Sequence, residues 1–302
     1  MRNKLGDILF KLGKKDKRIY IVVADISPAG SIDSFRKKFP NRFINVGVAE
    51  QTMIGISAGL AMQNKRPFAY TIAAFSVFRP FEMIRNDLCN QNLPVTIIGM
   101  GAGTIYSTLG CTHLTQEDIG VLRAVPNINI FSPCDALELE EIIKFCIKFS
   151  KGPSYVRIGK SGENIYTQHV KKKWKFAKIR RLERGEDVCI LTHGILVKLA
   201  YEVRSSYKKN KISIYSCSTL KPFDLEGLKK IFRIYKKIIV IEDHSLIGGL
   251  YDIVRGLAFE YHYPGKIINS SLKDEFIHNY GTQEDLLNQH GISLKKILQK
   301  LK

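Results

Sequence analysis

The stretch RFINVGVAEQTMIGISAGLA, residues 42–61, joins a short apolar strand to a helix and places one carboxylate, Glu50, at the junction. A strand followed by a helix is the repeating unit of a parallel sheet that helices cover. Near the start of a helix a carboxylate meets free N–H groups, so helix capping alone could explain Glu50. Its small and apolar neighbours leave a second interpretation open, in which Glu50 is a buried acid with a chemical role.

The same alternation continues on both sides of this stretch. Apolar runs such as IYIVVADI, PFAYTIA, PVTIIGMG and PSYVRIG alternate with helical periods, one of them from about Phe78 to Asn90. A polar, basic stretch follows, and a second series begins with DVCILTHG, KISIYSC and KIIVIED as its strands. The sequence therefore predicts an α/β protein of two consecutive domains, each with a mainly parallel sheet flanked by helices. The predicted boundaries are a first domain at residues 1–160, a linker at 161–184 and a second domain at 185–302.

Composition narrows the class of protein. No apolar run approaches the roughly 18 residues of a membrane span, and charges occupy the N-terminal segment where a signal peptide would be apolar, so a cytoplasmic protein is expected. The six cysteines contain no C-x-x-C pair, which is typical of reduced, buried thiols, and no metal ligands are predicted. The net charge of +19 suggests an acidic partner, but no nucleic-acid motif accompanies it, and a solvated lysine-rich surface is the favoured interpretation.

Candidate site residues follow the apolar runs, because ligands of open parallel sheets bind beyond the carboxyl ends of the strands. A carboxylate, an aromatic patch, an imidazole and a guanidinium could meet there. Each also has a structural explanation: phenylalanines spaced by three are typical of a core stripe, and the arginine could be an ion-pair partner. The candidates are Asp25, Glu50, Phe75, Phe78, His113 and Arg157.

Several stretches taken together resemble the transketolase family. RFINVGVAEQTMIGISAGLA, PFAYTIAAFSVFRPFEMIRND, CTHLTQEDIGVLRAVPNINIFSPCDALE and GPSYVRIGK look like its pyrimidine-binding domain, and GEDVCILTHG, STLKPFD and VIEDHSLIGGL like its C-terminal domain. Complete members begin with a further domain, in which a G-D-G motif and a later asparagine hold the diphosphate and a divalent metal. This sequence contains no G-D-G. It resembles the C-terminal half of a split transketolase.

The resemblance implies thiamine diphosphate as the cofactor and transfer of a two-carbon ketol unit from a ketose to an aldehyde. It implies a separate N-terminal subunit that carries the diphosphate site and Mg²⁺ or Ca²⁺, and assembly into a heterotetramer acting on a sugar or sugar phosphate. Glu50 would share a proton with the aminopyrimidine ring, and a desolvated setting would suit that role. The remaining implied contacts are Asp25, Ile26, Phe75, Phe78 and Phe81 with the cofactor, and His113 and Arg157 with the substrate.

Three positions depart from the family pattern. Leu109 replaces an aspartate that touches a sugar hydroxyl, Cys111 replaces a proline, and Gly101 lies near the place of an expected histidine. A less polar donor site follows, and a deoxy or branched sugar is a reasonable expectation.

Other functions stay open at this point. A 1-deoxyxylulose-5-phosphate synthase and a 2-oxoacid dehydrogenase E1 β subunit share the two-domain plan. A non-catalytic scaffolding subunit is an alternative of another class.

Overall fold

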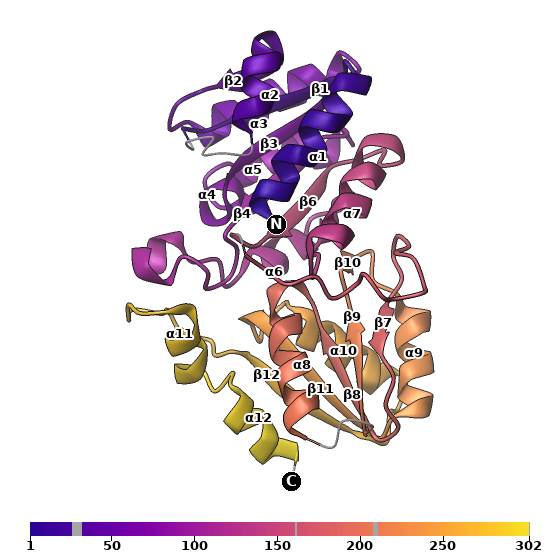
Figure 1. The fold of residues 1–302 in the computed structure, drawn as a ribbon. Helices are drawn as coiled ribbons and strands as arrows, with labels where there is room; N and C mark the ends of the chain where they lie inside the picture. Colours follow the sequence, from indigo (N-terminus) through magenta and orange to yellow (C-terminus); the bar gives the residue numbers. More distant parts are fainter. Residues whose placement is uncertain (26–31, 161, 208–210, 302) are drawn as a thin grey trace.

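A computed structural model describes residues 1–25, 32–160, 162–207 and 211–301 of the chain. These residues form two sheets, stacked one above the other in Figure 1, with helices on both faces of each sheet. Most neighbouring strands in both sheets are parallel. The predicted α/β class with two mainly parallel sheets is confirmed.

The first sheet has the strand order β10-β5-β6-β4-β3-β1-β2, and among its pairs only β10 with β5 is antiparallel. Its central strands are buried along their length, because helices cover both faces and leave no side for polar residues. The strands are β1 (Ile19–Val23), β2 (Phe43–Asn45), β3 (Arg66–Ile72), β4 (Thr96–Met100), β5 (Asn129–Phe131), β6 (Ser154–Ile158) and β10 (Thr219–Lys221).

Two groups of helices enclose this sheet. Helices α1 (Arg2–Lys15) and α7 (Ala136–Lys148) pack on one face, and α3 (Glu50–Met62) and α6 (Asp118–Arg123) on the other. Helix α1 was not predicted. Shorter segments complete the domain: α2 (Asp33–Lys38), η1 (Pro40–Arg42), η3 (Ser107–Leu109) and η4 (Cys111–His113).

The helix predicted from about Phe78 to Asn90 differs in the structure. Helix α4 (Ala73–Val77) begins directly after β3, and α5 (Phe81–Met83) and η2 (Ile84–Asn90) follow beyond Pro80. Proline has no N–H to donate and its ring crowds the preceding turn, so it separates the helical segments.

The second sheet has the order β12-β11-β8-β9-β7, with only β7 antiparallel to its neighbour among these pairs. Helices α8 (Val197–Ser206) and α12 (Leu294–Leu301) pack on one face, and α9 (Leu225–Ile234) and α10 (Leu250–Glu260) on the other. The remaining elements are β7 (Arg180–Glu183), β8 (Val188–Thr192), η5 (Gly194–Leu196), β9 (Ile212–Ser216), β11 (Lys237–Ser245), β12 (Lys266–Leu272) and α11 (Gln283–Gln289).

The two halves are joined by more than the chain between them. Strand β10 comes from the second half of the sequence but pairs with β5 of the first sheet. One apolar cluster continues from α3 and α6 to α9 and α10. The segment predicted as a linker contains β7, so part of it belongs to the second sheet. The boundaries at 160 and 184 stay predictions.

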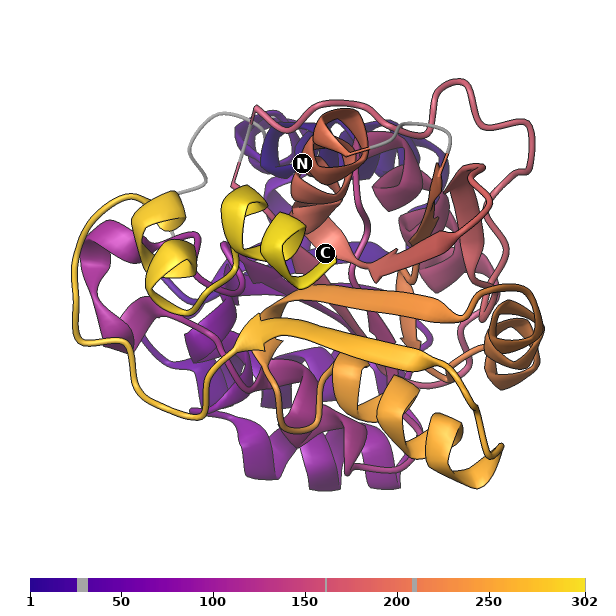
Figure 2. The ribbon, with the colours of Figure 1, turned by 90° about the horizontal axis from the view of Figure 1, so that it is seen from below.

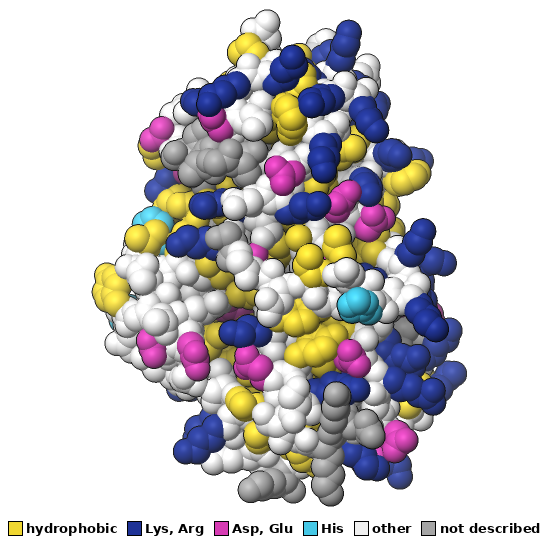
Figure 3. Space-filling view, viewed as in Figure 1, with side chains coloured by type: hydrophobic (Ala, Val, Ile, Leu, Met, Phe, Trp, Pro, Cys, Tyr) yellow, Lys and Arg dark blue, Asp and Glu magenta, His cyan; other side chains and the backbone are white. Residues whose placement is uncertain are grey.

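The surface is rich in cations. Figure 3 shows Lys and Arg side chains scattered over the visible face and gathered along its right edge, where Figure 1 places β7 and α9. No helix in the described part of the chain has the length and apolarity that crossing a membrane requires.

Candidate active site

Glu50 is the first residue of α3 and is buried, with 4% of its surface exposed. Ala49, the residue before it, offers no side-chain cap, so Glu50 brings its charge to the positive end of the helix itself. Its Oε1 accepts a hydrogen bond of 2.8 Å from Nη1 of Arg79. The desolvated position expected for Glu50 is therefore present, together with a cationic partner that the sequence did not suggest.

An aromatic contact continues this arrangement. The guanidinium carbon of Arg79 lies 4.0 Å from the ring centroid of Phe75, which α4 presents just beyond the end of β3. The Phe75 ring meets the imidazole of His113 edge-on, with 5.1 Å between centroids. Glu50, Arg79, Phe75 and His113 thus form one continuous row, which we call the Glu50–His113 row. It brings together three residues that the sequence analysis selected separately.

The row suits a flat nitrogen heterocycle. Such a ring needs an aromatic face to stack on and an acceptor for a ring N–H. Phe75 offers the face and Glu50 the acceptor, and the guanidinium of Arg79, itself planar and carrying N–H donors, makes both contacts in this structure. The residues present therefore fit a flat ring such as the aminopyrimidine of thiamine diphosphate, the cofactor that the resemblance implies.

The other residues predicted to contact the cofactor differ in their burial and surroundings. Phe78 is 40% exposed, and Phe81 packs against the apolar cluster beneath α3, as the core-stripe interpretation expects. Asp25 is exposed at the end of β1 with a φ of 42°, and its N–H donates to Oδ1 of Asn45 at 3.1 Å. Ile26 lies outside the described residues.

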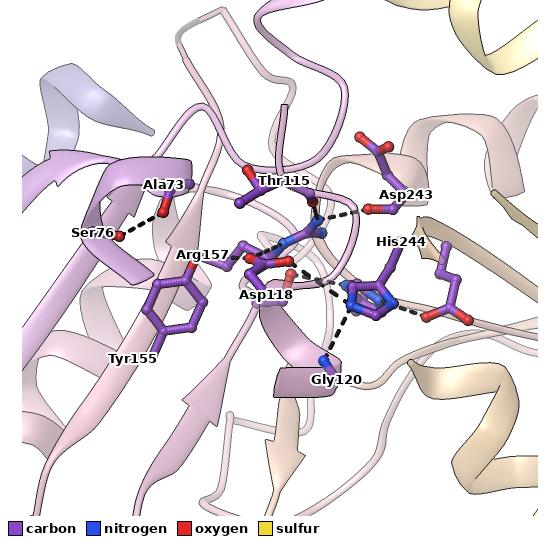
Figure 4. Close-up of polar contacts among 12 residues, drawn as sticks. Ala73, Ser76, Thr115, Asp118, Gly120, Tyr155, Arg157, Asp243 and His244 are labelled. Carbon is purple, nitrogen blue, oxygen red and sulfur yellow. Dashed lines mark hydrogen bonds and ion pairs between the residues drawn. The ribbon is translucent and has the colours of Figure 1, made fainter. Parts of the chain in front are cut away.

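Arg157, predicted to bind the substrate, is occupied by contacts within the chain. Its side chain is buried in β6, where Nε donates to Asp118 at 2.9 Å and Nη2 donates to the carbonyls of Thr115 at 3.1 Å and Asp243 at 2.6 Å (Figure 4). This is the ion-pair arrangement, and a substrate phosphate could reach the guanidinium only by displacing these partners. Lys160 is the exposed cation that follows β6 directly, with its ammonium 5.8 Å from the Tyr106 ring centroid.

The departures from the family pattern have visible consequences. Leu109 is an exposed apolar side chain in the segment before His113. Gly101 has a φ of 67°, and a Cβ there would overlap the ring of Tyr106. Tyr106 therefore fills the space that a side chain at residue 101 would need, which explains the missing histidine.

Sequence reasoning missed two residues of the site. Arg79 stands four residues after Phe75 in the quoted motif, a helical spacing that could have indicated contact between the two side chains. Asn45 accepts from the backbone N–H groups of Asp25 and Gly47 and so ties the ends of β1 and β2 together. An asparagine at a strand end was the available signal.

Two family models cover most of the chain. Residues 1–163 match the transketolase pyrimidine-binding domain and residues 177–297 match the transketolase C-terminal domain. The chain belongs to the transketolase family. Within this family it is similar to a transketolase C-terminal section of Methanocaldococcus jannaschii, with 34% identity over 100% of this chain and 96% of that one. It is also similar to an apulose-4-phosphate transketolase subunit of Phocaeicola vulgatus, with 32% identity over 98% of this chain and 94% of that one.

Solved structures agree with this family assignment. A split-gene transketolase described as an inactive β4 tetramer superposes with a TM-score of 0.88 at 32% identity, covering 99% of this chain and 95% of that one. Transketolase from Campylobacter jejuni, at 18% identity and a TM-score of 0.78, shares the fold, and this chain spans 46% of its length. The chain thus corresponds to the C-terminal part of a transketolase, as its sequence predicts.

No cluster of three His, Cys, Asp or Glu side chains suited to a metal occurs among the residues that the structure describes. That a partner subunit supplies the metal site stays a prediction.

Proposed function

We propose that this chain is the C-terminal subunit of a thiamine-diphosphate-dependent transketolase, which transfers a two-carbon ketol unit between a ketose and an aldehyde together with a separate N-terminal subunit. The Glu50–His113 row is the observation that carries the proposal, because it supplies a buried acid, a stacking face and an imidazole side by side. The partner would bring the diphosphate site and Mg²⁺ or Ca²⁺, and the assembly would be a heterotetramer.

Glu50, Phe75 and His113 each have a defined task. Thiamine diphosphate, when bound, supplies the carbanion chemistry that breaks and forms carbon–carbon bonds. Glu50 holds the proton at the ring nitrogen, and its low exposure keeps water from competing for that proton. Phe75 stacks on the ring and excludes water from one face. His113 is oriented through Nδ1, which lies 3.0 Å from Oγ1 of Thr112, so that Nε2 can serve a substrate oxygen.

We expect the donor to be a phosphorylated, modified ketose. The exposed Leu109 gives the donor side an apolar group, which favours a sugar with a missing or displaced hydroxyl. The relative from Phocaeicola vulgatus is named for apulose 4-phosphate, a substrate of this chemical class. We expect Lys160, rather than Arg157, to bind the substrate phosphate, because Lys160 is exposed beyond the end of β6.

A second candidate reaction uses the same row with a different donor. A 1-deoxyxylulose-5-phosphate synthase of Alkaliphilus oremlandii is 31% identical over 98% of this chain, which spans 47% of that enzyme. Such an enzyme would take pyruvate as donor and release carbon dioxide. Comparing pyruvate with ketose phosphates as donors therefore separates the two candidates.

The test is co-expression with the N-terminal subunit, followed by assays of ketol transfer with thiamine diphosphate and magnesium. We expect no activity from this chain alone and turnover from the complex. Glu50→Gln should lower kcat about a hundredfold or more, because the amide cannot hold and return the ring proton.

Glu82→Gln is the matched control, since Glu82 is an exposed acid on α5 that takes part in none of the contacts that make up the row. Full turnover by the Glu50→Gln complex would reject the role of Glu50, and a complex active only with pyruvate would favour the second candidate.

A further inference from the structure

The loop that carries His113 is held in place by contacts with the second domain. This loop, residues 101–116, leaves β4, passes through η3 and η4, and returns to a bridge in which the Thr115 N–H donates to the Gly103 carbonyl at 3.0 Å. We call it the His113 loop. Figures 1 and 2 both place the C-terminal segment around α11 beside it.

A buried carboxylate of β11 holds the base of the His113 loop. Asp243 accepts hydrogen bonds from the Thr104 backbone N–H at 3.0 Å and from Thr104 Oγ1 at 2.9 Å. Gln283 of α11 completes the contact, with Nε2 donating to Asp243 at 3.0 Å. Gly103 has a φ of 74°, and a Cβ there would overlap the Asp243 carboxylate. Only glycine lets the loop approach this acid so closely.

The other end of the loop is held by hydrogen bonds to backbone carbonyls. The Ser245 N–H of β11 donates to the Gln116 carbonyl at 2.7 Å, and Gln116 Nε2 donates to the Glu275 carbonyl at 3.2 Å. Glu275 belongs to the extended segment 273–281 between β12 and α11. Both ends of the His113 loop are therefore attached to the second domain. The position of the residues between these ends depends on the side chains that pack on them.

Tyr280 covers that middle. Gly110 is buried with a φ of 81°, and a Cβ at Gly110 would lie 2.9 Å from Cε1 and from Oη of Tyr280. The Gly110 carbonyl in turn accepts the His113 N–H at 3.0 Å, so the covered residue and the histidine share one turn. Ile277, 2% exposed, anchors the same extended segment in the second domain, whereas 70% of Tyr280 is exposed.

We propose that Tyr280 is a positioning residue for the donor side of the active site, through which the second domain sets the place of His113. Phe75 meets the imidazole edge-on, and the ring of Tyr280 limits how far the Gly110 turn beneath it can move away. Among the contacts of the described residues, Tyr280 meets Gly110 and none joins it directly to the row, so its effect reaches the reaction through the loop. The kinetic part of this proposal rests on the proposed function; the structural part does not.

Cys111 makes the structural part measurable on the full chain. It is exposed and adjacent to Gly110, whereas the other five cysteines are buried, so alkylation by iodoacetamide reports mainly on this loop. Tyr280→Ala should raise the alkylation rate at Cys111 roughly three- to tenfold, the effect of removing one aromatic contact. Tyr280→Phe keeps the ring and should restore the wild-type rate.

Phe276→Ala is the matched control, because Phe276 is an aromatic residue of the same segment with a similar exposure of 72%. It should leave Cys111 as in the wild type. Equal rates for Tyr280→Ala and Phe276→Ala would overturn the proposal, as would a Tyr280→Phe chain that behaves like Tyr280→Ala.

In the assembled enzyme, Tyr280→Ala should raise KM for the ketose donor and leave the KM for thiamine diphosphate unchanged, because the Glu50 end of the row is intact. A donor KM equal to that of the wild type would reject the positioning role. Absence of ketol transfer in the wild-type complex would instead reject the proposed function, and the alkylation result would still decide whether Tyr280 holds the loop.

Discussion

At the scale of the residue, the pair of Glu50 and Arg79 connects stability to ligand binding. A carboxylate as buried as Glu50 is costly without a partner, and the 2.8 Å contact with Arg79 offsets that cost. Arg79 is itself 46% exposed, so its side chain can leave toward solvent when a ring takes its place. The ion pair is thus stable in the free chain, and a bound ring can displace Arg79 from Glu50.

Arg79→Ala should have opposite effects on the free and the loaded protein. Without Arg79 the buried acid of the free chain loses its partner, so its melting temperature should fall. The cofactor no longer competes with a guanidinium, so the complex should bind thiamine diphosphate about three- to thirtyfold more tightly, the combined range of an ion pair with one exposed partner and a cation–π contact. Calorimetric titration of the complex and thermal denaturation of the chain measure the two effects.

Arg85→Ala is a suitable control, since Arg85 is another exposed arginine of the same region and bonds only to its neighbour Asn86 in the contacts described. Weaker cofactor binding by Arg79→Ala would show that Arg79 assists the ring rather than competing with it.

At the scale of the element, the structure shows which helices and strands could be predicted from the sequence and which could not. The buried strands were predictable, because runs of Val and Ile between helical periods are typical of parallel strands covered on both faces. Helix α1 was overlooked although Leu5, Ile8 and Leu9 carry a helical spacing and are buried. Pro80 could have indicated the break between α4 and α5.

Contacts between elements far apart in sequence were beyond prediction. Arg157 has no local signal that tells a phosphate ligand from an ion-pair partner. Its partner Asp118 is 39 residues away and the Asp243 carbonyl 86 residues away, so only the folded chain decides. The approach of Tyr280 to Gly110 has no local signal for the same reason.

Helix α6 and strand β11 are linked by a histidine that should make stability depend on pH. His244 Nδ1 donates to the Ser245 carbonyl at 2.8 Å, and Nε2 accepts from the Gly120 N–H at 3.2 Å. Burial holds the pKa of His244 below its ordinary value near 6.5. As the pH falls, His244 therefore binds a proton in the unfolded chain before it does so in the folded chain. The free energy of unfolding decreases as the pH falls through about 6.5.

His244→Gln should flatten this dependence, because its amide oxygen can accept from Gly120 without titrating. Urea denaturation at pH 7.5 and 5.5 measures the difference, with a limit of about 1.4 kcal/mol per pH unit for one proton. Buried acids such as Asp243, whose pKa burial raises, act in the opposite direction, so the comparison with wild type is decisive. His278→Gln, on the surface, should keep the wild-type slope. The same slope in His244→Gln would exclude His244 as its cause.

At the scale of the whole molecule, the two sheets form one unit. One apolar cluster spans both, β10 completes the edge of the first sheet, and the guanidinium of Arg157 is bonded to the Asp243 carbonyl of β11. We expect one cooperative transition in calorimetry, because neither half can unfold without exposing the shared cluster.

A fragment of residues 1–163 tests this expectation. It keeps every strand of the first sheet except β10. It loses the contact of α6 with His244 of β11 and the Asp243 carbonyl that accepts from Arg157, so it should melt well below the full chain or aggregate. Two separate transitions in the full chain, or a fragment as stable as the intact protein, would contradict it.

Binding of nucleic acid by the basic surface is also a question at this scale. Retention of the protein on DNA at near-physiological salt would support such binding, and no retention would dismiss it.

The contact between Arg79 and Glu50 also bears on how the cell supplies the enzyme. Under the proposed function, a subunit whose buried acid is already paired within its own chain can be synthesised ahead of its counterpart and kept in reserve. Production of the two chains then need not be matched in time, and the arrival of the cofactor with the counterpart becomes the event that turns a dormant chain into a working one.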